Sequence, residues 1–178
     1  MDVFLQTLVA GVLIGGIYGL IGIGMTLIMG VMGIINLAHG QLMMVAMYVT
    51  FALHAYLKID PYLSLLVAMP ALFLLGIFLQ KLLLNPLMEV DAVLPENQVL
   101  MTVGMGMVLA EIARFIFSSD YKSVVTSYTG SAFFLGNISF SMPMIIAFGF
   151  AVLLTVGLFL FLLKTDLGRS IRATAQDK

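Results

Sequence analysis

The chain has 178 residues, of which 62% are hydrophobic and 10% are charged, with a net charge of −1 and no cysteine. Soluble domains contain about 25% charged residues, so this composition excludes an ordinary soluble domain and indicates a chain that lies in a lipid bilayer. The near-neutral charge argues against nucleic acid as a partner, and a chain without cysteine cannot form disulfides, zinc–thiolate sites or iron–sulfur clusters.

Long apolar segments recur along the chain. A helix needs about 20 apolar residues to cross the roughly 30 Å hydrocarbon layer. Five segments are candidates, the second of them short: residues 4–29, 42–57, 61–80, 99–117 and 143–163. Because they are apolar on all sides, they are typical of membrane helices rather than of amphipathic surface helices. We therefore expect an all-α, polytopic integral membrane helix bundle, with a transmembrane domain over residues 1–163 and a polar segment over residues 164–178.

The first segment has two notable features. Asp2 stands where a signal peptide would carry Lys or Arg, so we interpret this segment as a permanent membrane helix. Its glycines share one helix face, and small residues let helices approach closely in lipid. We expect this face to pack against another helix; a sliding surface for a conformational cycle is the alternative. The glycines of this face are Gly11, Gly15, Gly19 and Gly22.

Three polar side chains, Asn36, His39 and Gln41, lie in the stretch GIINLAHGQL, inside a run from Val3 to Leu57 without Asp, Glu, Lys or Arg. Within a membrane, such groups are tolerated only where protein or water covers them. Either the stretch is a connection at the cytoplasmic interface, with Asn36 and Gln41 capping helix ends, or it is a bent or re-entrant segment that lines a solute path. A lone histidine is no metal site, and we expect neither metal nor cofactor.

Polar segments separate the later spans. Residues 81–98 carry two prolines and four charges, which predicts a loop, with or without a surface helix in it, and residues 118–141 predict turns that flank short extended segments. Lys and Arg concentrate in cytoplasmic loops, so we place the basic tail in the cytoplasm and, counting back through five spans, the N-terminus outside. The basic residues of the tail are Lys164, Arg169, Arg172 and Lys178.

Within the fourth span, Glu111 and Arg114 are three residues apart and therefore share one helix face. We expect an intramembrane ion pair, since unpaired charges are costly there; a gate or a docking contact is the alternative. The only Lys-Thr pair, Lys164-Thr165, lacks the glycines of a phosphate-binding loop. No catalytic constellation is visible, so we expect the chain not to be an enzyme.

The tail from Leu167 to Lys178 follows the last span directly. Leu167, Ile171 and Ala175 form an apolar line at four-residue spacing, which predicts a short amphipathic helix with Gly168 at its start. This helix is either the basic flank that any membrane protein may carry or a docking helix for a soluble partner.

Two motifs together resemble the permease subunits of branched-chain amino acid ABC transporters. They are INLAHGQ, preceded by GGIYGLIGIGMTLIMGVMGI, and GRSIRATAQD after the last span. The resemblance implies a bacterial inner-membrane subunit that leaves ATP hydrolysis to partner ATPase subunits and receives solute from a periplasmic binding protein, beside a second permease subunit. It also implies that the chain is the N-terminal part of such a subunit, apparently truncated.

When the family's motifs are matched to this sequence, the resemblance assigns the family's coupling segment to residues 164–178. The residues that it implies for ATPase coupling are Gly168, Arg169, Arg172, Ala173, Ala175 and Asp177. Asn36, His39 and Gln41 would line or brace the translocation path. We therefore expect a permease for branched-chain or related amino acids, with urea also open as a solute. A secondary transporter or channel without an ATPase, and a purely structural membrane subunit, are the alternatives.

Overall fold

A computed structural model of the protein describes residues 2–33, 35–88, 95–135 and 138–176. The described chain is mostly helical and contains five helices long and apolar enough to cross a membrane. These spans are Val3–Val31, His39–Leu57, Leu65–Leu84, Glu96–Phe117 and Met142–Lys164. The helical, five-span fold expected from the sequence is confirmed. The chain forms two compact units, one of Met1–Gly33 with Val125–Lys178, the other of Ile34–Val124.

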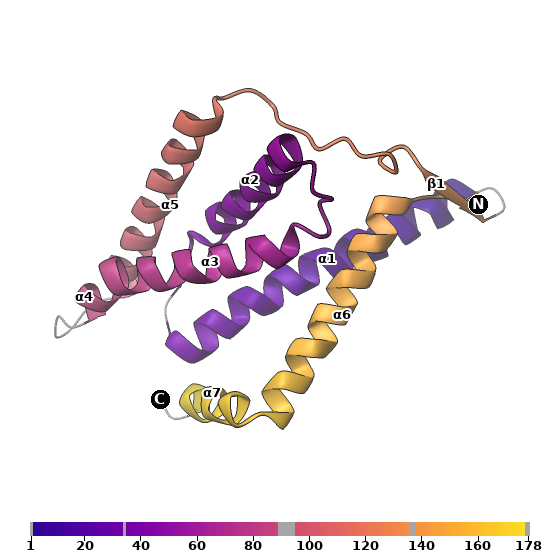
Figure 1. The fold of residues 1–178 in the computed structure, drawn as a ribbon. Coiled ribbons are helices and arrows are strands. Elements are labelled where there is room, and N and C mark those ends of the chain that lie inside the picture. Colours follow the sequence, from indigo (N-terminus) through magenta and orange to yellow (C-terminus); the bar gives the residue numbers. More distant parts are fainter. Residues whose placement is uncertain (1, 34, 89–94, 136–137, 177–178) are drawn as a thin grey trace. The chain divides into compact units, whose positions relative to one another are not determined.

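The first unit contains helices α1 (Asp2–Met32), α6 (Met142–Lys164) and α7 (Asp166–Gln176) and a β-hairpin. Helix α1 packs against α6, and the short α7 contacts both (Figure 1). With 31 residues, α1 is about 46 Å long, so it must tilt or extend beyond the hydrocarbon layer. It ends at Met32, and the next residue, Gly33, has a φ of 67° and donates its backbone N–H to Met29 O, as glycines that follow a helix commonly do.

Within their unit, the glycines on the predicted face of α1 contact no other helix. Within its unit, a Cβ at Gly11, Gly15, Gly19 or Gly22 would meet no heavy atom within 4 Å. Gly16, one position away from that face, lies directly against the ring of Phe148 in α6. The close approach of α1 to α6 therefore occurs at Gly16, and packing of the predicted glycine face against another helix stays a prediction.

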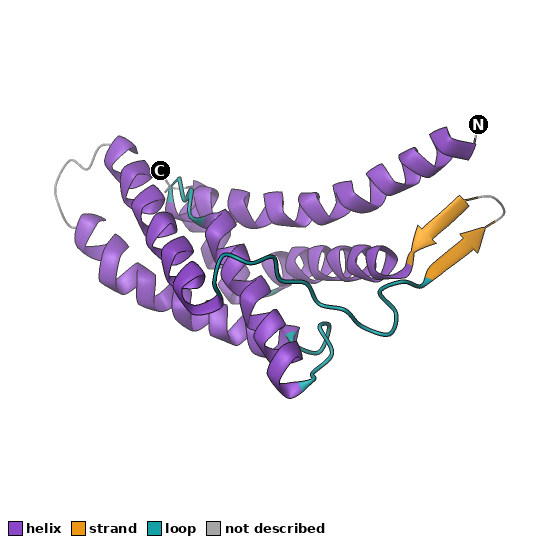
Figure 2. Cartoon of the chain, turned by 90° about the horizontal axis from the view of Figure 1, so that it is seen from above, coloured by secondary structure: helices purple, strands orange, loops and turns teal. Residues whose placement is uncertain are grey.

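The hairpin leads directly into α6 and lies beside the start of α1. Strand β1 (Ala132–Leu135) pairs antiparallel with β2 (Ile138–Ser141), in a register that sets Phe133 opposite Phe140 (Figure 2). Gln6 Nε2 of α1 donates to Ser139 Oγ at 3.0 Å and so ties the hairpin to the start of α1. The short extended segments expected between the fourth and fifth spans thus form a small sheet.

The second unit contains α2 (His39–Leu57), α3 (Leu65–Leu79), the π-helical turn η1 (Gln80–Leu84), α4 (Asn85–Met88) and α5 (Pro95–Phe117). Helix α2 packs against α3 and α5. The core of this second unit is small and apolar, with Ala38, Leu79, Met105 and Leu109 as the buried members.

Several element bounds differ from the sequence-based expectation, and each difference has a local cause. Helix α2 starts at His39 instead of residue 42 because Asn36 and the turn at Ala38 close the preceding chain. Helix α3 starts at Leu65 instead of residue 61, since Asp60 Oδ1 accepts the Tyr62 N–H and holds a turn. The expected loop over 81–98 is helical through Met88 and again from Pro95, a residue suited to a first helical turn.

Candidate functional site

The polar stretch before α2 is an ordered turn fixed by a threonine of α5. Asn36 Oδ1 accepts the backbone N–H of Ala38 at 3.0 Å. Thr102, fully buried, places its Oγ1 3.0 Å from Val99 O, 3.2 Å from Ile35 O and 3.3 Å from Leu37 N. Its single O–H donates to one of the two carbonyls, and its oxygen accepts from the Leu37 N–H. A buried hydroxyl needs such partners, and here they include the backbone groups that the turn leaves without helical bonds.

Gln41 and His39 lie within α2 rather than in the connection. Gln41 is half-buried and faces Gly106 of α5: a Cβ on that glycine would be 3.1 Å from Gln41 Cδ and Oε1. Gln41 Oε1 is buried and has no hydrogen-bond partner among the described residues. His39 is the first residue of α2 and is also half-buried. The structure thus sets the turn that Asn36 braces against Thr102 and the Gln41 amide against Gly106, one helical turn further along α5.

The two charges of α5 lie against each other on the helix surface. Arg114 Nη1 is 2.9 Å from Glu111 Oε1, and the two side chains are 59% and 65% exposed. An ion pair so exposed on a membrane-spanning helix is costly if lipid surrounds it. This face of α5 therefore needs protein or water beside it.

Helix α7 leaves α6 through a sharp corner at Thr165, visible where the two yellow helices meet (Figure 1). Thr165 Oγ1 accepts the backbone N–H of Gly168 at 3.0 Å, as an N-cap does, and donates to Phe161 O at 2.7 Å. A Cβ on Gly168 would lie 2.5 Å from both Phe161 O and Leu162 O. Only glycine fits this corner, because the obstructing atoms belong to the backbone of α6.

The two arginines of α7 have different surroundings. Arg169 Nη2 pairs with Asp166 Oδ1 at 2.5 Å, and both side chains are largely exposed. Arg172, also exposed, borders a groove of about 330 Å³ that Ile171 and Ala175 form with the end of α1 and with Leu162. Ala173 is exposed, and Asp177 lies outside the described residues. The expected amphipathic helix is thus present, with part of its apolar line covered by α1.

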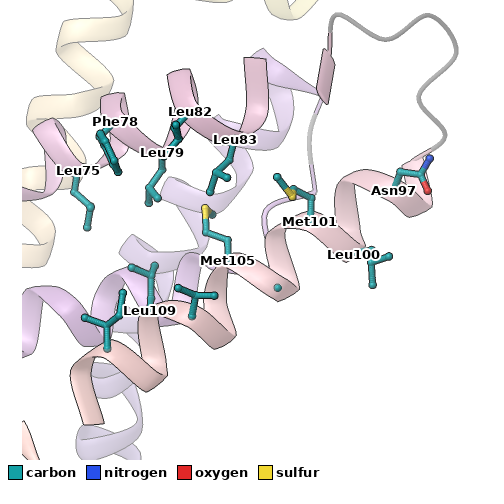
Figure 3. Close-up of a pocket in the computed structure, with 13 residues that line it drawn as sticks. Leu75, Phe78, Leu79, Leu82, Leu83, Asn97, Leu100, Met101, Met105 and Leu109 are labelled. Atoms are coloured by element: carbon teal, nitrogen blue, oxygen red, sulfur yellow. The ribbon is translucent and has the colours of Figure 1, made fainter. Parts of the chain in front are cut away.

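A large apolar groove separates α3 and η1 from α5. It has a volume of about 710 Å³, and leucines and methionines of the two sides face each other across it (Figure 3). Asn97 is its only polar lining side chain among the described residues, and none of the lining side chains is charged. The groove can therefore cover apolar groups but offers no counter-charge to an ionic solute.

Several residues of these sites were missed by the sequence interpretation. Thr102 and Gly106 gave no signal, since a threonine or glycine in an apolar span is common. Their roles depend on the approach of α2 to α5, which joins residues more than 60 positions apart. Gly168 was noted as a helix start, but its contact with the backbone of α6 was not foreseen.

Comparison with known proteins gives a consistent result. Residues 7–178 match the family model described as branched-chain amino acid transport system / permease component. The chain is 30% identical over 186 aligned positions to the high-affinity branched-chain amino acid transport system permease protein BraD of Pseudomonas aeruginosa, covering 98% of this chain and 60% of that protein.

Two further relatives carry similar names. The probable branched-chain amino acid transport permease protein LivH of Methanocaldococcus jannaschii is 29% identical over 171 positions, covering 89% of this chain and 50% of that protein. The LivH permease protein of Escherichia coli K12 is 46% identical over 54 positions, or 30% of this chain and 18% of that protein. The chain thus spans 60% or less of the length of each of these relatives. No solved structure matches it.

Proposed function

The chain belongs to the family of branched-chain amino acid transport permease components, and from this membership we propose that it is the membrane-spanning subunit of an ABC importer. The solute is a branched-chain or related amino acid, brought by a periplasmic binding protein. ATP is hydrolysed on separate subunits, and a second permease subunit completes the path. The membrane is the bacterial cytoplasmic membrane, with the N-terminus outside and α7 in the cytoplasm.

The corner between α6 and α7 is the observation that carries this proposal. A helix that spans the membrane is followed directly by a short exposed helix whose angle is set by Thr165 and by the missing side chain of Gly168. A fixed angle lets a push on α7 reach α6 as a rigid-body motion, which is how packed elements transmit movement. Gly168, Arg169, Arg172, Ala173, Ala175 and Asp177 form the ATPase-coupling segment in this proposal.

The path is assigned to the polar end of α2. Asn36 braces the turn before α2, while Gln41 has a buried oxygen without a partner among the described residues. Such an oxygen is costly to bury without a hydrogen bond, and passing water or solute would supply that bond. His39 stands beside them at the first position of α2.

The ion pair on α5 is assigned to a protein contact. Its exposure on a membrane-spanning helix favours a neighbour other than lipid, and the second permease subunit of the importer is such a neighbour. Glu111 and Arg114 are thereby a docking contact rather than a proton site, since the arginine neutralises the carboxylate.

Charge reversal on α7 tests the docking role. We expect Arg169→Glu and Arg172→Glu, made together in the complete permease, to reduce co-purification of the ATPase subunits strongly, because like charges then oppose the docking surface. Lys58→Glu, a charge reversal of the same kind at a single residue in the turn after α2, is the control and should leave co-purification intact. Equal recovery of ATPase with the α7 variant and with the control would contradict the docking role.

A further inference from the structure

A second large cavity in the Ile34–Val124 unit has a different chemistry from the apolar groove. It has a volume of about 750 Å³ and lies between α2, the start of α3 and the segment 119–124 that follows α5. This volume is in the range of small-molecule sites. The walls from the helices are mostly apolar, and α2 adds the hydroxyl-bearing Tyr48 and Thr50; the apolar lining residues include Met44, Met47, Phe51, Leu65 and Ala68.

The segment 119–124 brings one anion and one cation to the same cavity. Lys122 Nζ lies 3.9 Å from Asp120 Oδ2, at the outer limit of an ion pair. The Asp120 side chain is 81% exposed, whereas that of Lys122 is only 31% exposed. Because charge-assisted hydrogen bonds are about 2.7–2.9 Å long, neither charge is fully engaged by the other. Asp120 Oδ2 accepts from Ser118 Oγ, which leaves Asp120 Oδ1 and the Lys122 ammonium able to bind a ligand.

The positions of these two charges are fixed by the end of α5. Phe117 stacks on Tyr48 of α2 with ring centroids 4.4 Å apart, so the chain leaves α5 beside the cavity. Ser118 then adopts a φ of 63°, and its Oγ donates to Asp120 Oδ2 at 2.8 Å. A non-glycine residue in this conformation is uncommon, and here it turns the chain back toward α2.

We propose that this cavity is a binding site for a zwitterionic amino acid with an uncharged, apolar side chain. The solute carboxylate pairs with Lys122, its ammonium group pairs with Asp120, and its side chain lies against the methionines, Phe51 and Leu65. This inference rests on the proposed transport function and names the site in this chain that meets the solute. It is separate from the polar end of α2, which is assigned to the path.

The same chemistry predicts what the cavity rejects. Among the described lining residues, Asp120 and Lys122 are the only carboxylate and the only amine, and no guanidinium is present. A glutamate side chain would place a charge against the apolar wall without a partner, which is unfavourable. Urea has no charges for the two ionic groups and no apolar part for the wall.

The chain contains no cysteine, so a single introduced thiol can report on the cavity. Met47, which is 63% exposed and lines the cavity, is changed to cysteine in the complete permease, and its rate of maleimide labelling is measured. We expect saturating leucine to slow labelling several-fold, while glutamate and urea at the same concentration have no effect. Thr50→Cys, at a second lining position, repeats the measurement if Met47→Cys does not fold. A thiol at Leu100, in the apolar groove of Figure 3, is the control that leucine should not protect.

Variants of Lys122 then connect protection to charge. Lys122→Ala should raise the leucine concentration needed for half-protection about tenfold, the value of one charge-assisted hydrogen bond, and Lys122→Arg should retain most of the protection. The site would be overturned if leucine did not slow labelling. It would also be overturned if Lys122→Ala left the leucine concentration for half-protection unchanged. This assay needs neither ATP nor partner subunits, so it separates the site from the proposed function. ATP-driven leucine uptake without protection would overturn the site but not the function. Protection without uptake would support the site and contradict the proposed function.

Discussion

Substitution of Gly168 by alanine should change the direction of α7 without unfolding it. The new Cβ would lie 2.5 Å from two carbonyl oxygens and 2.6 Å from Leu162 Cα, where real Cβ contacts stay above 3.0 Å. Since the obstructing atoms are all backbone, no side-chain rotation relieves the overlap. The roughly 1 kcal/mol that alanine gains over glycine in a helix does not remove a clash whose cost is about 1–3 kcal/mol, so the corner must open.

The size of the movement follows from the geometry of α7. Gly168 lies about 4.5 Å along the axis from Thr165, and the 11-residue helix is about 16 Å long. A retreat of about 0.5 Å at Gly168 therefore moves the far end of α7 by about 2 Å. Movement of an ATPase bound to this helix would then be transmitted to α6 in a different direction. Solute uptake should therefore fall, while ATPase binding persists in part.

Double electron–electron resonance between spin labels at Val12 on α1 and Ala175 on α7 measures this displacement. Both helices belong to one unit, and the cysteine-free sequence permits clean labelling. Gly157→Ala is the matched control, because a Cβ at that position in α6 meets no heavy atom within 4 Å. A distance distribution for Gly168→Ala that equals those of the wild type and the control, together with normal uptake, would refute the reasoning.

Two further substitutions test the packing inside each unit. Gly16→Ala should lower the thermal midpoint by a few degrees through its clash with the ring of Phe148, whereas Gly15→Ala should not; equal midpoints for the two variants would refute the α1–α6 contact. Thr102→Val should cost about 1–3 kcal/mol in unfolding free energy, because Leu37 N and Ile35 O lose their buried partner, and Thr102→Ser should recover most of it. Unfolding curves that coincide for valine and serine would show that the hydroxyl does not hold the turn.

The sequence was informative where the solvent alone decides the structure. Uncharged runs such as Val3–Leu57 must be helical where they cross a bilayer, because backbone groups there have no water to bind. The five spans could therefore be predicted without knowledge of any tertiary contact. The helix over the tail was also predictable, since the four-residue spacing of Leu167, Ile171 and Ala175 places them on one face of an amphipathic helix.

The sequence was less informative where a long-range contact decides. The start of α2 depends on Thr102, which lies on another helix. The choice of Gly16 over its neighbours depends on where α6 places Phe148. The cavity with Asp120 and Lys122 exists because Phe117 stacks on Tyr48. None of these pairings leaves a periodic pattern, so each of them required the structure.

Solute uptake by reconstituted vesicles tests the central claim most directly. The complete permease is assembled with its ATPase subunits and its binding protein, and accumulation of labelled leucine is followed with ATP, without nucleotide, and with a proton gradient alone. The account predicts accumulation only when ATP and the binding protein are both supplied. Accumulation driven by the proton gradient without nucleotide would contradict it.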